Sequence, residues 1–408
     1  MFLTSNYPRW EGDSTTPFVH DLAVDLTERG WRVEVLAPHA PGAARREDLD
    51  GVTVRRFRYL LPESAQTVCY GGGALVNLRG SRATKAKLPA LVAAEWAATA
   101  TALAARGGAD VVHAHWTLPQ GFVAASTPFP RVPRVLTVHG GDVFGLRGKV
   151  LDRFARYALR GADRVTVNSS ATDRAVREIA GPGVEPLRVP IGVDLGRVPR
   201  AELVHDIRTR YRSATGPLLV FLGRLVEEKG IADIVRAVHL LSVELPGISA
   251  VLVGTGQHRD RIVELSAELG VGDRVHLPGW ADRADVPSWF AAADLALAPS
   301  RIGVDGWTEG QGLSIVEAMA TGTPVVATRT GGIPDTITDG HTGILVPPAD
   351  PGALAAAVRR LVAAPEQAVA MGARGAATAH ERFDRGITAD RMDAIYRELI
   401  AARSAPPG

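Results

Sequence analysis

Short apolar runs alternate with longer amphipathic segments along the whole chain. In the first half, runs rich in β-branched residues predict strands. The segment 17–29 has apolar residues at helical spacing before Gly30, which predicts a helix that ends there. Strands that alternate with helices are typical of a parallel sheet covered by helices on both faces. The predicted strands of this half are residues 1–5, 32–36, 109–113, 134–138 and 164–168.

A second series of the same kind follows a polar stretch at residues 197–215. The chain has 408 residues, more than one hydrophobic core usually supports, so we expect two doubly wound domains with a boundary near residues 190–215. Ligands of open parallel sheets bind beyond the carboxyl ends of the strands, so we expect the site in a cleft between the two sheets. The predicted strands of this half are residues 217–222, 249–253, 273–277, 294–298 and 323–327.

Composition narrows the class of protein. The 46 basic and 44 acidic residues give a formal net charge of +2, which argues against a general polyanion binder such as a nucleic-acid-binding protein. The single cysteine, Cys69, excludes an intramolecular disulfide and favours a reducing compartment. No apolar run approaches the roughly 18 residues of a membrane span, so we expect a cytoplasmic protein. The arginine-rich stretch 131–164 is either a solvated helix face or a contact to anionic lipid at the inner membrane face.

Glycine turns follow three predicted strands of the second half. Gly223 and Arg224 follow the first of these strands, and Lys229 lies just before the N-terminus of the next helix. Two cations beside a helix N-terminus suit a diphosphate, although surface pairing with neighbouring glutamates is the alternative. The turns that contain Gly254 and that follow Leu277 come after the next two strands, so the three turns together indicate one extended pocket.

Two glutamates lie at the start of an apolar helix in the same half. Glu309 precedes Gly312, where the helix begins, and Glu317 lies inside the helix. Eight helical residues span roughly 12 Å, which exceeds the roughly 5–9.5 Å between paired carboxylates in glycoside hydrolases. We therefore expect the two acids to contact different parts of one elongated ligand, with a solvated helix residue as the alternative for Glu317.

Histidines follow two strands of the first half. His139 opens onto glycines and Asp142, a position from which a histidine could reach a reacting group. His113 and His115 share one face of a strand, as metal ligands can, but no third ligand accompanies them, so we expect no bound metal. His115 and Trp116 suit the wall of an acceptor site, because an aromatic face fits a sugar or cyclitol ring.

The string from Glu309 to Ala327, which reads Glu-Gly-x-Gly-Leu-Ser-Ile-Val-Glu-Ala-Met-Ala-Thr-Gly-Thr-Pro-Val-Val-Ala, resembles the signature of family 4 GT-B glycosyltransferases, also called glycosyl transferases group 1. Gly331-Gly332-Ile333-Pro334-Asp335 and the Gly223-Arg224 pair with Lys229 are similar to that family too. The resemblance covers nearly the whole chain. It implies an α/β GT-B fold of two Rossmann-like domains: an acceptor-binding domain at 1–195 with a crossover helix at 385–408, and a donor-binding domain at 196–384.

The resemblance also implies roles for single residues. Arg224 and Lys229 would neutralise the donor diphosphate, and Glu317 would hold the ribose hydroxyls. His139 and Glu309 would be the catalytic residues, with His139 positioning the donor sugar and the acceptor. Asp142 would orient the loop and bind the acceptor. The remaining donor contacts would come from Glu309 with the backbone of Gly312, Leu313 and Ser314, and from the backbone at Gly223, Gly254 and Leu277.

One loop departs from the family pattern. Many relatives have a Gly-Gly pair after the first strand, where this chain has the single Gly12 followed by Asp13. The departure puts a phosphate-binding role of this loop in doubt, and acceptor recognition by Arg9, Gly12 or Asp13 is the alternative. Ile191 likewise stands where the family usually has asparagine.

We therefore predict a retaining, metal-independent hexosyltransferase that needs no further cofactor. It would move a hexose or N-acetylhexosamine from a UDP- or GDP-sugar to a hydroxyl of a small-molecule or lipid-linked acceptor, in the biosynthesis of surface glycans, glycolipids or secondary metabolites. A GT-B epimerase or phosphorylase and a non-catalytic sugar-nucleotide binder are the alternatives. A dehydrogenase is disfavoured, because no Gly-x-Gly-x-x-Gly follows the first strand.

Overall fold

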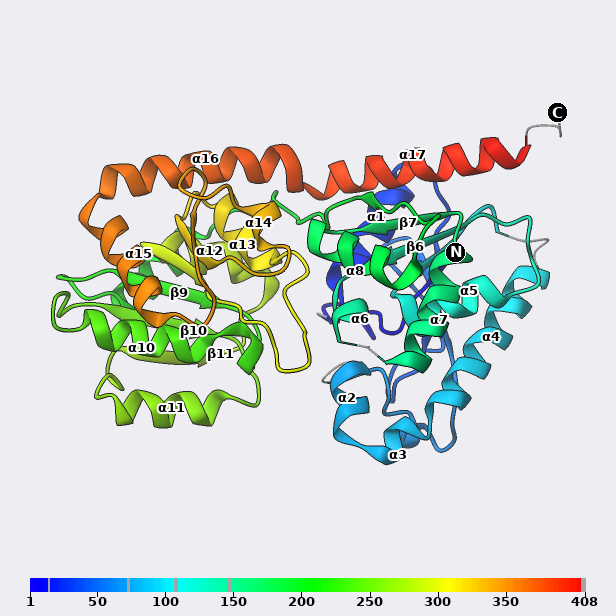
Figure 1. The fold of residues 1–408 in the computed structure, drawn as a ribbon, viewed down its shortest axis with the longest axis horizontal. Helices are drawn as coiled ribbons and strands as arrows, with labels where there is room; N and C mark the ends of the chain where they lie inside the picture. Colours follow the sequence, from blue (N-terminus) through cyan, green and yellow to red (C-terminus); the bar gives the residue numbers. More distant parts are fainter. Residues whose placement is uncertain (14, 72–73, 106–108, 146–147, 405–408) are drawn as a thin grey trace. The chain divides into compact units, whose positions relative to one another are not determined.

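The computed structural model describes residues 1–13, 15–71, 74–105, 109–145 and 148–404 of the chain (Figure 1). The chain forms two compact units. Unit 1 comprises Met1–Gly192 and Arg385–Gly408, and unit 2 comprises Val193–Asp384. The division therefore falls three residues before the expected 195/196 boundary and at the expected start of the last helix.

Unit 1 contains a sheet in which parallel strands predominate. The order of its eight described strands is β3-β4-β2-β1-β5-β6-β7-β8, and only the β3–β4 pair among them is antiparallel. Phe2 lies between Val35 and His113 in the register, so β1 is a central strand and not an edge. The strands are β1 (Phe2–Leu3), β2 (Glu34–Pro38), β3 (Arg46–Leu49), β4 (Val52–Phe57), β5 (Val112–His115), β6 (Arg134–Val138), β7 (Arg164–Val167) and β8 (Leu187–Arg188).

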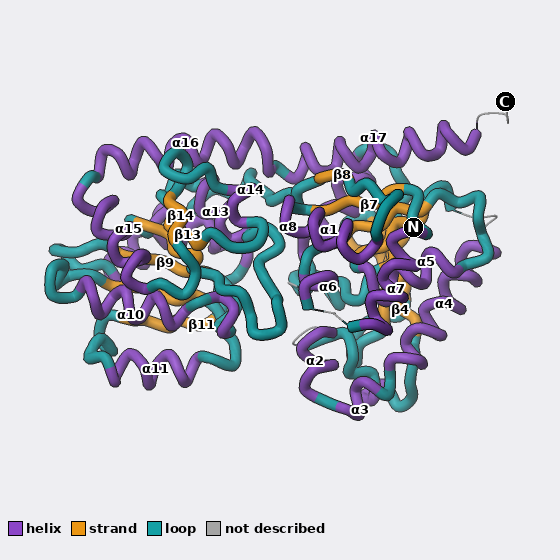
Figure 2. The backbone as a smooth tube through the Cα atoms, viewed as in Figure 1, coloured by secondary structure: helices purple, strands orange, loops and turns teal. Residues whose placement is uncertain are grey.

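Helices cover both faces of this sheet (Figure 2). One face packs on α1 (Pro17–Glu28) and α17 (Arg385–Ser404), whose Met392 and Tyr396 join Phe2 and Val35 in one core. The other face packs on a second core, built with residues of the helices between β4 and β8. These helices are α2 (Ala74–Gly80), α3 (Arg82–Lys85), α4 (Leu88–Ala105), α5 (Phe122–Ser126), α6 (Gly141–Phe144), α7 (Lys149–Arg160) and α8 (Ser170–Ala180).

Unit 2 repeats the plan with a parallel sheet of six described strands in the order β11-β10-β9-β12-β13-β14. Helices line both faces here as well, over two separate apolar cores. The strands are β9 (Leu218–Leu222), β10 (Ser249–Val253), β11 (Val275–Gly279), β12 (Leu295–Ala298), β13 (Val325–Thr328) and β14 (Ile344–Val346). The helices are α9 (Ala201–Tyr211), α10 (Ile231–Leu241), α11 (Arg259–Glu268), α12 (Val286–Ala292), α13 (Leu313–Ala320), α14 (Ile333–Thr336), α15 (Pro351–Ala363) and α16 (Pro365–Phe383). The predicted fold of two doubly wound, Rossmann-like units is confirmed.

One expectation about apolar segments is wrong. The helical stretch Arg82–Ala105 has a mean hydropathy of 1.4 over an 18-residue window, so by length and composition it could cross a membrane. A search for an unbroken apolar run misses it, because threonines and Glu95 interrupt the run. α4, its main part, contributes Leu91 and Leu103 to the core of unit 1, and 28% of that 18-residue window is buried.

Candidate active site

A lysine and a glutamate meet beyond the carboxyl end of β9. Lys229, in the 3-10 turn Glu227–Lys229, forms an ion pair with Glu309, and the Oγ of Ser300 donates a 3.4 Å hydrogen bond to the same carboxylate. Both paired side chains are largely buried, whereas Arg224 is exposed. Segments that lie far apart in sequence thus bring together three of the predicted donor-site residues, namely Arg224, Lys229 and Glu309.

The charge of Glu309 is set by two opposing effects. Burial alone raises the pKa of this carboxyl, but the adjacent Lys229 ammonium and the more distant Arg224 guanidinium outweigh it and lower the pKa below its ordinary value. Glu309 is therefore an anion near neutral pH and cannot donate a proton there. The site presents one carboxylate and two cations to a ligand.

Two glycines hold the backbone of Glu309 in place. The amide of Gly332 donates a 2.8 Å hydrogen bond to the Glu309 carbonyl. At Gly331, with φ of 55°, an added Cβ would lie 2.1 Å from that carbonyl oxygen, so a side chain there is excluded. The Gly-Gly pair at 331–332 therefore fixes the position of Glu309, a role that its sequence pattern alone does not reveal.

The helix α13 begins beside this carboxylate. Gly312 precedes it in the left-handed conformation, with φ of 83°, and Leu313 and Ser314 form its first turn. Free amides of a first turn favour anions such as phosphate. Glu317 lies one helical turn after Leu313, half-buried on α13, and so follows the helix N-terminus as the sequence predicts.

The glycines in the turns after β9 and β10 allow the backbones of neighbouring loops to approach each other closely. At Gly254, with φ of 141°, an added Cβ would lie 1.9 Å from the carbonyl oxygen of Gly223, so the two turns touch through their backbones. Gly256 makes a similar approach to Leu225. The side chain of Leu277 packs against the core of unit 2, which leaves its backbone as the part available to a ligand.

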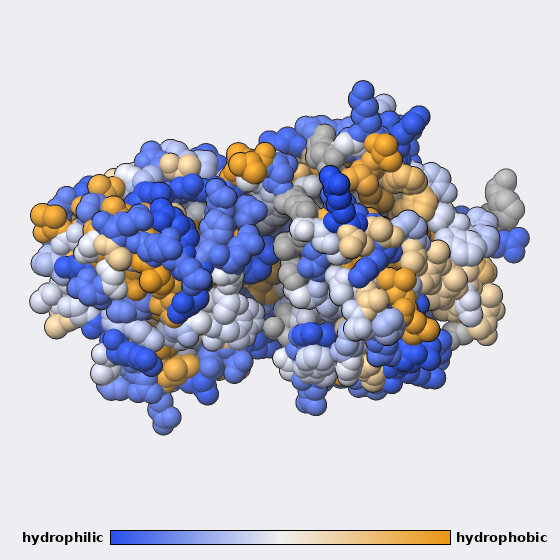
Figure 3. Space-filling view, turned by 90° about the horizontal axis from the view of Figure 1, so that it is seen from below, coloured by the Kyte–Doolittle hydropathy of each residue, from blue (hydrophilic) through white to orange (hydrophobic). Residues whose placement is uncertain are grey.

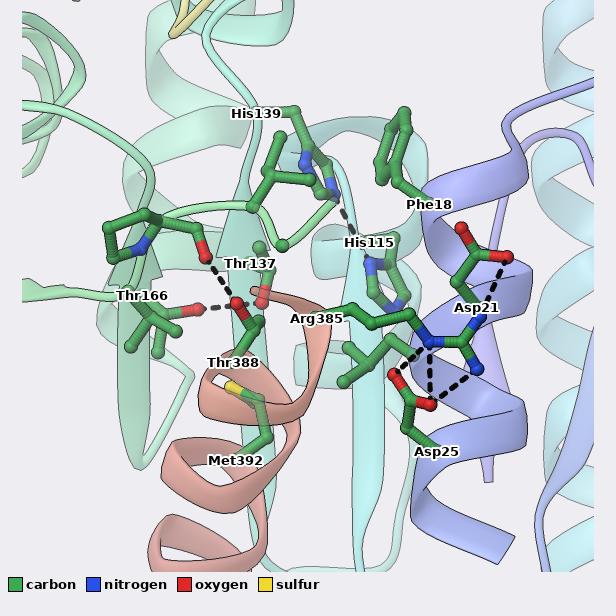
Figure 4. Close-up of a pocket in the computed structure, with 15 residues that line it drawn as sticks. Phe18, Asp21, Asp25, His115, Thr137, His139, Thr166, Arg385, Thr388 and Met392 are labelled. Atoms are coloured by element: carbon green, nitrogen blue, oxygen red, sulfur yellow. Dashed lines mark hydrogen bonds and ion pairs between the residues drawn. The ribbon is translucent and has the colours of Figure 1, made fainter. Parts of the chain in front are cut away.

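In unit 1, the ends of β5 and β6 carry the predicted histidines to a small cavity of about 30 Å³ (Figure 4). His115 and His139 line it from the strands, Phe18 from α1, and Arg385 and Thr388 from α17. The Arg385 guanidinium binds Asp25 at 2.8 Å and joins the first helix to the last one. Sequence reasoning did not predict Phe18, Asp25 or Arg385 as part of this site.

The three histidines form a neutral row. Nδ1 of His115 lies 3.1 Å from Nε2 of His139, and the ring of His113 lies 4.1 Å from that of His115 between centroids. Burial lowers the pKa of His139 to about 3, and it lowers those of His113 and His115 well below their ordinary value, with further lowering from neighbouring imidazoles. All three are neutral near pH 7. His139 can therefore donate or accept a hydrogen bond with a sugar hydroxyl, but it carries no charge.

Asp142 holds the loop that carries His139. One oxygen of its carboxylate accepts a 3.1 Å bond from the His139 amide, and the other accepts bonds from the amide and hydroxyl of Thr117 at 2.7 and 2.8 Å. The side chain is buried, and its oxygens are engaged within the protein. These contacts fit the expected role of Asp142 in orienting the loop. Both of its carboxylate oxygens are already hydrogen-bonded within the protein, which does not favour the expected contact with an acceptor.

Trp116 lies beside His139 at the end of β5. Its backbone adopts φ of 75°, which is uncommon for a residue with a side chain, and its ring centroid lies 4.9 Å from that of His139. The ring of Phe18 approaches His139 at 5.0 Å. Trp116 is half-buried, whereas His115 is buried beneath it, so only Trp116 of the two predicted wall residues has appreciable exposed surface.

The loop after β1 is held by its own side chains. Asp13 accepts bonds from Nε and the backbone amide of Arg9 at 2.7 and 2.9 Å, and from the Thr15 hydroxyl at 3.0 Å. Burial raises and the Arg9 contacts lower the pKa of Asp13, with a net lowering. Gly12 is exposed, has φ of 81° and permits the turn. Arg9 and Asp13 therefore stabilise the loop, and neither is a free group that awaits an acceptor.

The described residues offer no cluster of three or more histidine, cysteine, aspartate or glutamate side chains that could hold a metal ion. The groups available for chemistry are the Lys229–Glu309 pair with Arg224 in unit 2, and the neutral His139 in unit 1. Cations at a helix N-terminus suit phosphates, and a neutral imidazole suits hydroxyls.

Family models match both units of the chain. Residues 206–378 match the family model of the glycosyl transferases group 1, and residues 15–192 match that of the glycosyl transferase 4-like domain. Among solved structures, sucrose-phosphate synthase from Thermosynechococcus elongatus superposes with a TM-score of 0.79 at 25% identity and covers 98% of this chain and 100% of that one. HepE of Anabaena, solved with UDP, has a TM-score of 0.75 at 21% identity and covers 97% of this chain and 99% of that one, which shows the shared fold.

Curated relatives are consistent with these matches. A GDP-mannose-dependent α-(1-6)-phosphatidylinositol monomannoside mannosyltransferase of Mycobacterium tuberculosis is 34% identical over 65% of this chain and 70% of its own length. The enzyme of the same description from Mycolicibacterium smegmatis is 35% identical over 59% of this chain, and the match spans 64% of that protein's length. A D-inositol 3-phosphate glycosyltransferase of Kineococcus radiotolerans is 29% identical over 96% of this chain and 92% of its own length. The chain belongs to the family 4 GT-B glycosyltransferases.

Proposed function

We propose that this protein transfers a hexose or N-acetylhexosamine from a nucleotide diphosphate-sugar to a hydroxyl group, with retention of anomeric configuration and without a metal ion. The observation that carries the proposal is the group formed by Lys229, Glu309 and Arg224 beside the N-terminus of α13. Two cations and free helix amides match the two phosphates of such a donor, and one carboxylate matches its hydroxyls.

The names of the relatives support the same class of reaction. Two of them are described as GDP-mannose-dependent, one as acting on D-inositol 3-phosphate, and the HepE structure was solved with UDP. These descriptions favour a GDP- or UDP-sugar donor and an acceptor that is a cyclitol or a lipid-linked glycan. A cytoplasmic location follows from this proposal, since nucleotide sugars are its substrates.

The chemical steps follow from the charges in the site. As the bond from the anomeric carbon to the diphosphate breaks, negative charge grows on the leaving phosphate, where Arg224, Lys229 and the α13 amides stabilise it. The acceptor hydroxyl bonds to the anomeric carbon on the face that the diphosphate leaves, and its proton passes to a departing phosphate oxygen. Neutral His139 contacts a sugar hydroxyl and holds the ring in place.

The test starts with thermal unfolding in the presence of GDP-mannose, UDP-glucose and UDP-N-acetylglucosamine. The true donor stabilises the folded protein by about 2.7 kcal/mol at a hundredfold excess over its dissociation constant. Turnover is then measured with inositol phosphates and glycolipids as acceptors, and the anomeric configuration of the product is read by NMR. A product of inverted configuration contradicts the proposed mechanism.

Matched variants connect the result to the site. We expect K229M to weaken the shift by the donor and H139A to reduce turnover while the shift by the donor stays. R259A, an exposed arginine of α11 in the same unit, is the control and keeps both. Full turnover in H139A would contradict the role of His139 without affecting that of the unit 2 site.

A further inference from the structure

Helix α7 exposes large apolar side chains to solvent, whereas a surface helix normally turns such side chains toward the protein core. Val150 is 66% exposed, Phe154 46% and Tyr157 50%, and Leu151 is exposed as well. Only the small residues Ala155 and Ala158, with Leu159, face the core. At 100° per residue, Val150, Phe154 and Tyr157 share one side of the helix, so they form a continuous apolar stripe toward solvent.

A basic stripe runs beside the apolar one on the same helix. Lys149, Arg153, Arg156 and Arg160 are spaced by three or four residues, are exposed and lie within roughly 60° of one another around the helix axis. α7 itself has these four basic residues and one acidic residue, Asp152. Arg156 and Arg160 also hold the end of α8, since their Nε atoms donate 2.8 and 2.9 Å hydrogen bonds to the carbonyls of Ile179 and Ala180. The chain as a whole is almost neutral, so α7 concentrates positive charge.

The apolar surface continues across α5 to α4. The hydroxyl of Tyr157 donates a 3.4 Å bond to the Ala125 carbonyl, and the indole of Trp96 donates one of 3.4 Å to the next carbonyl, that of Ser126. The two aromatic rings thus lie on either side of the last turn of α5. Phe122 on α5 packs edge-on against Phe154 at 5.3 Å. The outward residues of α4 are otherwise small and uncharged, and Figure 3 shows an extended pale to deep orange area over the right-hand part of unit 1.

We propose that this surface, made of α7 with Trp96 and α5, is a docking site for an anionic lipid bilayer, on which α7 lies parallel to the membrane plane. We call it the α7 surface. Val150 and Phe154 would enter the boundary between headgroups and acyl chains, while the basic stripe would contact lipid phosphates. Tryptophan and tyrosine are favoured at that depth because each ring combines an apolar body with a polar group.

A bilayer fits this surface better than an acidic protein does. The basic residues form a row along the whole helix, next to a row of exposed aliphatic and aromatic residues. A bilayer meets both rows at once, with phosphates at one depth and hydrocarbon at the next. The proposal goes beyond sugar transfer, since binding to vesicles is measured without turnover.

The test is sedimentation of the full-length protein with vesicles of phosphatidylcholine alone or mixed with phosphatidylglycerol. We expect binding to the anionic vesicles, a decline at high salt, and weak binding to neutral ones. K149E/R153E and, independently, V150S/F154S are each expected to lower the partition coefficient at least about tenfold. Quenching of Trp96 fluorescence by brominated lipid, lost in W96F, reports that the ring reaches the bilayer.

The matched control is V263S/R259E on α11 of unit 2, which changes an exposed valine and an exposed arginine and is expected to bind vesicles as the wild type does. Thermal unfolding, with its shift by the sugar nucleotide, verifies that each variant is folded. Equal binding to neutral and anionic vesicles, an equal loss in the control, or no binding at all would overturn the proposal. Vesicle binding that persists in a protein without transferase activity would leave it standing and contradict the proposed function alone.

Discussion

Nδ1 of His115 lies 3.1 Å from Nε2 of His139, and the two imidazole planes differ by only 10°. Because both rings are neutral, one of these nitrogens carries the shared hydrogen and the other accepts it. Among the described residues, Nδ1 of His139 and Nε2 of His115 have no hydrogen-bond partner. His115 therefore selects the tautomer of His139, and with it whether the buried Nδ1 of His139 is a donor or an acceptor.

A variant of His115 tests this relationship. H115F keeps a ring but removes the hydrogen bond, and we expect turnover to fall about tenfold, equivalent to about 1.4 kcal/mol, because the tautomer of His139 is no longer fixed. H115N, whose amide can occupy the position of Nδ1, is expected to recover much of the loss. Steady-state kinetics and the nitrogen chemical shifts of His139 measure both effects. H205F, at an exposed histidine of unit 2, is the control, and unchanged His139 shifts in H115F would contradict the argument.

Lys229 and Glu309 allow stability to be separated from function. K229M leaves a largely buried carboxylate without its partner, so we expect a loss of about 2 kcal/mol in the free energy of unfolding and a higher pKa of Glu309. K229M/E309Q removes both charges and is expected to recover most of the stability but none of the activity. Chemical denaturation and turnover are measured in parallel. Recovery of turnover in the double variant would show that the pair is structural.

Glu95 predicts a pH-dependent stability. It is fully buried on α4, its nearest polar partner is the Gln120 amide at 3.3 Å, and burial raises its pKa to about 8 although that amide lowers it. The folded state therefore retains a proton that the unfolded chain releases near pH 4.5. The contribution of Glu95 to stability is fully present below pH 4.5 and is lost as the pH rises through 8, by up to about 5 kcal/mol.

The comparison of wild type and E95Q measures this contribution. Urea denaturation between pH 5 and pH 8.5 is expected to show a falling free energy of unfolding in the wild type and a flatter profile in E95Q. E185Q, at an exposed glutamate of the same unit, should follow the wild type. Parallel profiles for wild type and E95Q would mean that Glu95 ionises at an ordinary pH.

The ion pair between Asp25 and Arg385 is expected to hold the last helix on unit 1. Burial raises the pKa of Asp25 and Arg385 opposes that effect, with a net increase. R385M removes the guanidinium that binds the buried Asp25 carboxyl, so we expect a loss of about 3 kcal/mol, and R385M/D25N should regain part of it. Hydrogen exchange of α1 and α17 measures the change, and unaltered protection of both helices in R385M would contradict it.

Much of the fold follows from local patterns. The strands predicted at 134–138 and 249–253 coincide with β6 and β10, because each is a short apolar run with clear turn residues around it. The β3–β4 hairpin was missed although Asp50-Gly51 marks its turn, since its first strand is mostly charged. The strand expected at 109–113 begins later, at Val112, because pairing with β6 and not composition sets its ends.

The candidate site was predictable only where contacts are close in sequence or follow strand ends. Glu309, Lys229 and His139 are found from turns and strands alone. The bond between Tyr396 and His113 joins residues 283 positions apart, and no local pattern specifies it. The buried state of His115 likewise depends on Phe2 and α17, which pack over it from the two ends of the chain.

The last helix has a consequence for the order of folding during synthesis. Met392, Ile395, Tyr396 and Leu399 of α17 belong to the core of unit 1, next to Phe2 and Val19. A ribosome that synthesises this chain therefore releases every residue of unit 2 before it releases the helix that completes unit 1. Unit 2 can fold on the ribosome before α17 is synthesised, whereas the core of unit 1 stays incomplete until α17 has emerged.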